Sequence, residues 1–370
     1  MRIIYFTHSL TSCWNHGNAH FLRGLLRELA SRGHAVTSYE PEQAWSRQNL
    51  IAEHGELQVT RFRARFHQVD VRYDGETAAV EAMLDGADLV EVHEWTAPET
   101  IAAIGAVRKR GGSFVLLFHD THHRAVSDPS ALRKVDLSGY DGVLAFASSL
   151  AEVYRRNGWG RRVFVLHEAA DTRTFRPLEG ESDQKREGVV WIGNWGDGER
   201  SNEISTFLLE PAHEASLPID VYGVRYPASA LRQLAEHGAR YLGWLPNIDV
   251  PKVFARYPMT VHIPRCFYAA QLPGTPTIRV FEALACGIPL ICAPWEDSEH
   301  LFEPGADYLV AADKSEMRAH MRDLSNDPSL RASLARSGLE RIRARHTCAH
   351  RADQLLAICA EIATPFAGVA

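Results

Sequence analysis

The sequence predicts an α/β protein that contains two doubly wound parallel sheets. Short apolar runs of strand length alternate with longer stretches of helical periodicity along the chain. A polar segment with Pro and Gly at 171–187 interrupts this alternation, and the pattern then restarts. Because 370 residues suffice for two domains, we expect Rossmann-like domains at 1–170 and 188–346. They would face each other across a cleft, with 347–370 as a terminal helix that packs back on the first domain.

The net charge, the cysteines and the lengths of the apolar runs limit the classes of protein to which this chain can belong. A formal net charge of −6 argues against general nucleic-acid binding. The six cysteines show no CxxC spacing, so we expect free thiols in a reducing, cytoplasmic compartment. Residues 1–6 predict a first strand rather than a signal peptide, and no run of 18 apolar residues occurs. We therefore expect no transmembrane segment, and a peripheral membrane contact stays open.

In the first half of the chain, predicted strands alternate with predicted helices, as a doubly wound sheet requires. A strand at 2–7 leads through a polar loop to a helix whose buried face carries Phe21, Leu22 and Leu25. That loop contains Gly17 but no GxGxxG spacing, which argues against a dehydrogenase. We expect residues 57–62 to form a strand, with Arg61, Arg63 and Arg65 projecting from one face. Further strands are predicted at 34–39, 87–92, 113–118, 142–146 and 163–166, and a helix at 98–110.

Polar side chains follow two of these strands. His93-Glu94 ends one strand and His119-Asp120 ends another. Parallel strands meet at their carboxyl ends, so we expect both pairs to face one cleft. Glu94 and Asp120 either act as an acid/base pair or are ordinary carboxylates that solvate a polar cleft.

Other catalytic motifs find little support. His119, His122 and His123 form either a metal cluster or a set of hydrogen-bonding groups, and since no third-ligand spacing is evident we expect no metal. The chain has no GxSxG, Walker or HExxH motif, so neither a serine hydrolase nor a P-loop enzyme is indicated.

The second half repeats the pattern. Strands are predicted at 188–193, 218–222, 239–242, 259–263, 290–293 and 307–310. A Gly-containing loop at 194–200 follows the first of these strands. Helices are predicted up to 213 and at 228–237, 314–326, 328–345 and 347–363.

The most informative helix is predicted at 275–286. Thr275 would cap it, Pro276 would take its first position, and Gly287 would end it. The N–H groups of Thr277 and Ile278, with Arg279 beside them, would make a phosphate site. Glu282 lies about 7–8 Å further along the helix axis, which is roughly the distance from a pyrophosphate to the ribose of one nucleotide. An ordinary amphipathic helix with an Arg–Glu pair is the alternative.

Four segments resemble GT-B glycosyltransferases of the retaining family-4 type, especially the spore-maturation-type branch. They are 29–36 (LASRGHAV), 170–177 (ADTRTFRP), 241–245 (YLGWL) and 279–289 (RVFEALACGIP). The resemblance spans most of the chain in the correct order. It implies transfer of a sugar from a nucleoside diphosphate sugar, UDP- or GDP-linked, to a hydroxyl acceptor. It also implies retention at the anomeric carbon and no metal or other cofactor.

The resemblance also implies roles for individual residues in donor binding. Glu282 would hold the ribose hydroxyls, and the helix start at Thr277, Ile278 and Arg279 would bind the diphosphate. Arg200 would neutralise the leaving diphosphate. Trp244 or Leu245 would lie along the nucleobase.

The resemblance implies further roles in the first domain. His119 would approach the donor sugar, and Gly17 would let the backbone approach the phosphate or sugar. The acceptor side would include His93, Glu94 and Trp14.

One position departs from the family pattern. The family's first glutamate would fall at Gly274, so the loop containing Gln271 and Gly274 would have to meet the sugar through an amide or backbone N–H groups. Two alternatives to a transferase therefore stay open. One is a GT-B nucleotide-sugar epimerase or hydrolase that uses Glu94 and Asp120, and the other is a nucleotide-binding GT-B protein without transfer activity.

Overall fold

The computed structural model describes residues 1–15, 17–66, 69–73, 79–178, 187–196 and 198–364. The chain divides into two compact units. The first unit comprises Met1–Glu168 and Cys348–Ala370, and the second comprises Ala169–Thr347. Each unit contains its own parallel sheet. The predicted linker at 171–187 lies partly outside the described residues, which omit 179–186.

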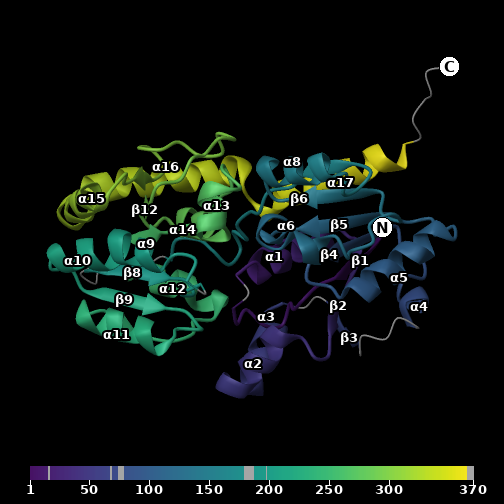
Figure 1. Ribbon diagram of the computed structural model, residues 1–370, viewed down its shortest axis with the longest axis horizontal. Helices are drawn as coiled ribbons and strands as arrows, with labels where there is room; N and C mark the ends of the chain where they lie inside the picture. The colour runs from purple at the N-terminus through teal and green to yellow at the C-terminus, as the bar shows by residue number, and fades with distance from the viewer. Residues whose placement is uncertain (16, 67–68, 74–78, 179–186, 197, 365–370) are drawn as a thin grey trace. The chain divides into compact units, whose positions relative to one another are not determined.

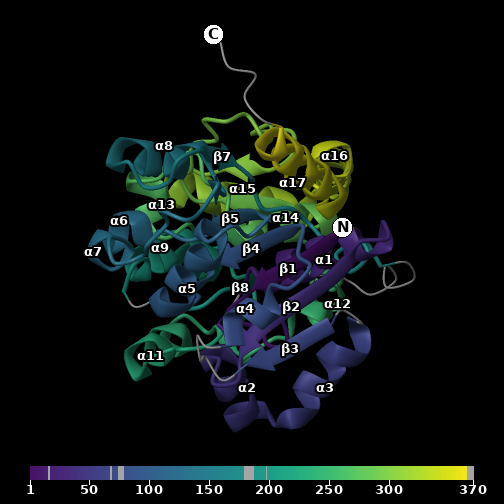
Figure 2. The ribbon, with the colours of Figure 1, turned by 90° about the vertical axis from the view of Figure 1, so that its right-hand side faces the viewer.

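The first unit has a seven-stranded sheet in the order β3-β2-β1-β4-β5-β6-β7, and successive strands of this order lie side by side in Figure 2. Its strands are β1 (Arg2–Phe6), β2 (Ala35–Pro41), β3 (Val69–Tyr73), β4 (Leu89–His93), β5 (Val115–Asp120), β6 (Gly142–Ala145) and β7 (Val163–Val165). All paired strands run parallel. Ile3, Ile4 and Phe118 are fully buried, as expected for central strands covered on both faces.

Helices complete the first unit. They are α1 (Ala19–Ser31), α2 (Trp45–His54), α3 (Glu56–Arg65), α4 (Val80–Met83), α5 (Pro98–Lys109), α6 (Arg124–Ser127), α7 (Pro129–Leu132), α8 (Ser148–Asn157) and α17 (Cys348–Ala363). The last helix, α17, packs against the first, α1. Cys348 Sγ lies 3.8 Å from the carbonyl oxygen of Phe21, and Arg32 pairs with Asp353 at 2.6 Å.

The predicted strand at 57–62 is wrong, because these residues belong to α3. Val59 and Phe62 are its buried residues, and their spacing of three is helical. The period-two spacing of the arginines therefore does not set a strand face, and Arg61, Arg63 and Arg65 spread around a helix instead. Helix α2 and strand β3 were missed by the sequence patterns, and Figure 1 shows α2 and α3 beyond the β2–β3 edge.

The second unit has a six-stranded sheet in the order β10-β9-β8-β11-β12-β13. Its strands are β8 (Val189–Ile192), β9 (Ile219–Tyr222), β10 (Arg240–Tyr241), β11 (Thr260–His262), β12 (Leu290–Cys292) and β13 (Leu309–Val310). Its helices are α9 (Ser201–Ile204), the π-helix η2 (Ser205–Leu209), α10 (Glu210–Glu214), α11 (Ala228–Glu236), the 3₁₀-helix η3 (Asn247–Asp249), α12 (Val250–Phe254), α13 (Cys266–Ala270), α14 (Ile278–Cys286), α15 (Lys314–Asn326) and α16 (Pro328–Arg345). Trp191, Val261 and Met317 belong to its buried core.

Candidate functional site

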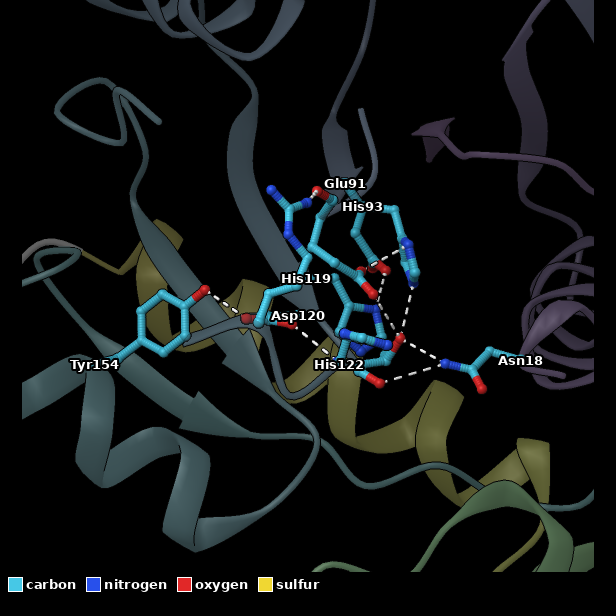
Figure 3. Close-up of polar contacts among 10 residues, drawn as sticks. Asn18, Glu91, His93, His119, Asp120, His122 and Tyr154 are labelled. Carbon is cyan, nitrogen blue, oxygen red and sulfur yellow. Dashed lines mark hydrogen bonds and ion pairs between the residues drawn. The ribbon is translucent and has the colours of Figure 1, made fainter. Parts of the chain in front are cut away.

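The first unit brings the two histidine-containing strand ends together. His93 of β4 and His119 of β5 are register partners, and their ring centroids lie 5.5 Å apart. Both side chains are buried. The carboxyl ends of parallel strands are the edge at which α/β sheets bind ligands, so this cluster is the candidate site of the first unit (Figure 3).

His119 is oriented by a carboxylate that the sequence analysis missed. Its Nδ1 lies 2.7 Å from Oε1 of Glu91, and both side chains are almost fully buried. A carboxylate oxygen accepts hydrogen bonds, so this contact favours the tautomer in which Nδ1 carries the hydrogen. Within the described part of the chain, the buried Nε2 of His119 has no hydrogen-bond partner. A charged residue inside the apolar run of β4 was the available sequence signal for Glu91.

A polar network surrounds His93. Its Nδ1 lies 2.7 Å from Oε2 of Glu94, and its Nε2 lies 3.2 Å from Oγ1 of Thr121. The Thr121 hydroxyl also lies 3.1 Å from Oε1 of Glu94 and receives a bond of 2.7 Å from Asn18 Nδ2. Asn18 precedes α1, so the loop after β1 contributes to this network. Arg124 donates to the backbone carbonyl of Glu94 at 3.2 Å.

Glu94 and Asp120 have opposite pKa shifts. Burial alone would raise the pKa of Glu94, but His93, which also hydrogen-bonds to it, lowers that pKa below its ordinary value. Burial, with the charge of Glu94, raises the pKa of Asp120 to about 7. Oδ2 of Asp120 accepts from the Tyr154 hydroxyl at 2.7 Å, and Oδ1 accepts from the His122 amide at 2.9 Å. Glu94 is therefore ionised at neutral pH, whereas Asp120 is partly protonated.

The other two predicted residues of the first unit are Trp14 and Gly17. The Trp14 side chain is 4% exposed and its Nε1 donates to Glu53 at 2.7 Å. Its ring packs edge-on against Trp45, with ring centroids 4.9 Å apart. This indole therefore contributes to the packing around α2. Gly17 is exposed in the turn before α1.

In the second unit, helix α14 begins later than predicted. Its N-cap is Thr277, so Thr275 and Pro276 lie outside the helix, and the predicted cap at Thr275 is wrong. The indole of Trp295 donates to the carbonyl oxygen of Thr275 at 3.1 Å, in the extended segment before the helix. Gly287 ends α14 in the left-handed conformation, as predicted.

Three arginines accompany the start of α14. Arg200 donates to the carbonyl oxygens of Ile263 at 2.8 Å and Asn194 at 2.6 Å, so its guanidinium has a fixed position. Burial and the positive charges of Arg265 and Arg279 lower the pKa of Arg200 to about 10. The guanidinium remains charged at neutral pH.

Each of the other two arginines has an acidic partner. Arg265 pairs with Glu199 at 3.1 Å, and Arg279 pairs with Glu282 within the helix. The Glu282 side chain is fully buried. The structure thus brings Arg200, Arg279 and Glu282 into one electrostatic cluster in the second unit.

His262 was missed by the sequence analysis. Its Nε2 lies 3.0 Å from Oγ1 of Thr277, so β11 contacts the N-cap of α14. Burial, followed by the charges of Arg200 and Arg279, lowers the pKa of His262 to about 3. The imidazole is therefore neutral at physiological pH and leaves the positive charge of the cluster to the arginines.

The other predicted donor residues lie in loops. Trp244 and Leu245 are half-buried after β10. Gly274 has a φ of +79°, and a Cβ at this position would lie 2.0 Å from the Ser298 hydroxyl oxygen. A glutamate at position 274 is therefore incompatible with the present backbone and the present position of Ser298.

The described residues show neither a metal-ligand cluster nor a candidate membrane-spanning helix. They contain no group of three or more His, Cys, Asp or Glu side chains placed to hold a metal ion. None of their helices combines the length and hydropathy that a membrane crossing requires.

Comparisons with known proteins agree with the fold. Residues 200–357 match a family model described as glycosyl transferase-like. No curated protein sequence matches the chain. The structure of Anabaena Alr3699/HepE in complex with UDP-glucose is similar with a TM-score of 0.72 at 13% identity, covering 98% of this chain and 100% of that chain.

Two further solved structures are similar. Sucrose-phosphate synthase from Thermosynechococcus elongatus has a TM-score of 0.66 at 13% identity, covering 98% of this chain and 99% of that chain. An alpha-glucosyltransferase in complex with UDP and a 13-mer DNA containing a HMU base has a TM-score of 0.70 at 13% identity, covering 97% and 99%. The chain therefore has the GT-B fold, as the sequence predicted.

Proposed function

We propose that the protein is a retaining, metal-independent glycosyltransferase that moves a hexosyl group from a nucleoside diphosphate sugar to a hydroxyl acceptor. The observation that carries this proposal is the electrostatic cluster of Arg200, Arg265 and Arg279, of which Arg279 lies in the first turn of α14. A helix N-terminus with several guanidinium groups favours a diphosphate. The match of residues 200–357 to the glycosyl transferase-like model supports the same function for this region.

Arg200 has a specific role in this proposal. Cleavage of the sugar–phosphate bond leaves negative charge on the departing diphosphate, and groups already fixed around it stabilise that charge without reorganisation. Two backbone carbonyls hold the Arg200 guanidinium. Arg200 and the start of α14 would therefore supply the positive charge that a divalent cation supplies elsewhere.

Glu282 and His119 complete the proposed donor site. Glu282 would accept from the ribose hydroxyls, and its contact with Arg279 would couple ribose binding to diphosphate binding. In the first unit, Glu91 would hold His119 so that Nε2 meets a hydroxyl of the donor sugar. His93 and Glu94 would bind the acceptor. The similar structures of Anabaena Alr3699/HepE contain UDP and glucose or UDP-glucose, which supports UDP-glucose as the first donor to test.

Calorimetric titration with UDP-glucose and GDP-mannose tests this proposal. We expect micromolar to millimolar binding of one donor, and Glu282→Ala should weaken it at least about tenfold because a buried polar partner is lost. Glu340→Ala, on the exposed surface of α16, is the matched control and should bind normally. The proposal fails if neither donor binds. A strong loss of transfer after addition of EDTA would refute metal independence.

The opposite pKa shifts of Glu94 and Asp120 favour a second candidate, a nucleotide-sugar hydrolase or epimerase. One carboxylate and one carboxylic acid in the same site are the pair that acid/base chemistry requires. This function predicts a changed sugar, or free nucleoside diphosphate, without any acceptor. Formation of nucleoside diphosphate only when an acceptor hydroxyl is present would reject it and support the transferase.

A further inference from the structure

A cavity of about 290 Å³ lies in the first unit, away from the residues discussed above. The segment after α7 forms one wall with Arg133, Leu137 and Ser138, and the turn after α8 forms the other with Trp159 and Arg161. All lining residues belong to the first unit, so the cavity depends on that unit alone.

The cavity lies at the opposite edge of the sheet from the candidate site. Ser138 precedes β6 and Arg161 precedes β7, so both segments lead into the amino ends of their strands. His93 and His119 stand at the carboxyl ends of β4 and β5. Because β4 to β7 are all parallel, the cavity and the histidine cluster lie at opposite edges. The cavity is therefore separate from the proposed transfer site.

The cavity carries positive charge that no acidic group within the described part of the chain neutralises through an ion pair. Arg133 and Arg161 are exposed, and among the described residues neither guanidinium group makes an ion pair or a hydrogen bond. Neighbouring arginines differ, since Arg156 pairs with Glu152 at 3.8 Å and Arg162 pairs with Glu361.

Asp136, an acidic residue near the cavity, already has hydrogen-bond and ion-pair partners. Asp136 accepts from the Ser138 amide at 2.9 Å and lies 3.9 Å from Lys109 Nζ. Its pKa is lowered, first by a hydrogen bond from the Ser138 side chain, so it remains ionised. The two guanidinium groups thus remain available to an external anion. A phosphate monoester carries about −1.5 to −2 charge at pH 7, which suits two such groups.

The rest of the cavity lining is mostly apolar, and the turn after α8 is closely packed. Trp159 packs edge-on against Tyr154, with ring centroids 5.8 Å apart. Gly160 has a φ of +97°, and a Cβ there would lie 2.6 Å from a methyl carbon of Val143. This close approach fixes the turn against β6. A supported indole beside two arginines suits the ring of a small organic phosphate, and the volume is close to the lower limit of small-ligand pockets, about 300 Å³.

We propose that this cavity binds a small phosphate monoester of monosaccharide size. Arg133 and Arg161 hold the phosphoryl group, and Trp159 contacts the organic body. The proposal does not depend on the proposed transferase function, because none of these residues belongs to that site.

Calorimetric titration of the full chain with glucose 6-phosphate, inorganic phosphate and glucose tests the proposal. We expect glucose 6-phosphate to bind more tightly than inorganic phosphate, and glucose to show no binding. The double variant Arg133→Gln/Arg161→Gln should lose at least tenfold in affinity. Arg156→Gln, which changes an exposed arginine of α8 that is already paired with Glu152, should bind as the wild type does. Thermal melting checks that each variant remains folded.

Three results would overturn the proposal. The first is no binding of glucose 6-phosphate at millimolar concentration. The second is binding that Arg279→Gln abolishes and the double variant retains, which would assign the phosphate to α14. The third is co-sedimentation with phosphatidic acid vesicles that depends on Arg133 and Arg161 without glucose 6-phosphate binding. That result would assign the surface to a lipid headgroup.

Discussion

Glu94 and Asp120 are both buried, yet their pKa values shift in opposite directions, because burial and the charge of Glu94 raise the pKa of Asp120, whereas His93 outweighs burial at Glu94. Glu94 faces a histidine ring nitrogen at 2.7 Å, whereas Asp120 faces a tyrosine hydroxyl and a backbone amide. A histidine in contact with a carboxylate offsets the cost of burying it, whereas a tyrosine hydroxyl and a backbone amide offset that cost only partly here. Residue type alone therefore does not identify the acid and the base of this site.

The raised pKa of Asp120 predicts how stability depends on pH. The folded state binds this proton up to about pH 7, whereas an unfolded aspartate loses it near 3.8. The free energy of unfolding should therefore fall as the pH rises between these values, by up to about 4 kcal/mol. Asp120→Asn keeps a neutral group of the same shape and should reduce this fall. Urea unfolding at pH 5, 7 and 8 measures it.

Asp128 supplies the control for this measurement. It is exposed and caps α7, and asparagine is an equally good cap. Asp128→Asn should leave the fall between pH 5 and 8 as in the wild type. An Asp120→Asn variant that is less stable than the wild type at pH 8 would contradict the raised pKa.

The bond between Glu91 and His119 predicts a second effect at a single residue. Glutamine at position 91 can accept from Nδ1 or donate to it, so His119 would lose its fixed tautomer. If His119 positions the donor sugar as proposed, Glu91→Gln should lower kcat by roughly a hundredfold with little change in donor KM. ¹⁵N chemical shifts of His119 would report the tautomer directly. An unchanged kcat with an altered tautomer would remove His119 from the mechanism.

At the scale of elements, the loop before α14 gives a steric reason why position 274 carries glycine and not the glutamate of the family pattern. Gly274 combines a positive φ with close contact to Ser298, whereas Gly305 has a φ of +87° and open space around it. Gly305→Ala should cost about 1–2 kcal/mol of unfolding free energy for the backbone conformation. Gly274→Ala should cost roughly 1 kcal/mol more because of overpacking.

A double-mutant cycle with Ser298→Ala tests why Gly274→Ala should cost more unfolding free energy than Gly305→Ala. Removal of the Ser298 hydroxyl should recover most of the difference between the two glycine variants, measured by urea unfolding. Equal costs for Gly274→Ala and Gly305→Ala would show that the loop adapts freely. In that case the lack of a carboxylate at position 274 would have no steric cause.

The elements differ in how well the sequence predicts them. Helices α15 and α16 match their predicted bounds, since Asp313 and Asp327 cap them as the sequence pattern requires. Helix α3 was predicted as a strand because its arginines alternate, although its two buried residues follow a helical period. Short amphipathic segments carry too few apolar positions to distinguish the two periods.

The candidate site shows the same contrast. His93 and His119 were predictable because both end apolar runs, and parallel strands align their ends. Glu91 was missed because it lies inside β4, and His262 because the predicted strand at 259–263 continued past it, although it is the last residue of β11. Their roles depend on tertiary partners, His119 and Thr277, that lie 28 and 15 residues away in sequence.

At the scale of the whole molecule, the chain leaves the first unit at Glu168 and returns to it at Cys348. Arg351 of α17 connects the segment that leaves the first unit with the segment that returns to it, because its Nε donates to the carbonyl oxygen of His167 at 2.8 Å. Burial lowers the pKa of Arg351 to about 10, and it remains charged. The first unit thus depends on a helix that is made after the entire second unit.

This arrangement predicts a localised effect of a change in α17. Leu355 is fully buried in the first unit, so Leu355→Ala should destabilise that unit by about 2–5 kcal/mol. Hydrogen exchange should accelerate in β1 and β5, while β8 and β11 keep their protection. Leu231→Ala, on the exposed side of α11, should change neither unit by more than about 0.5 kcal/mol. Equal loss of protection in both sheets would show that the two units unfold as one.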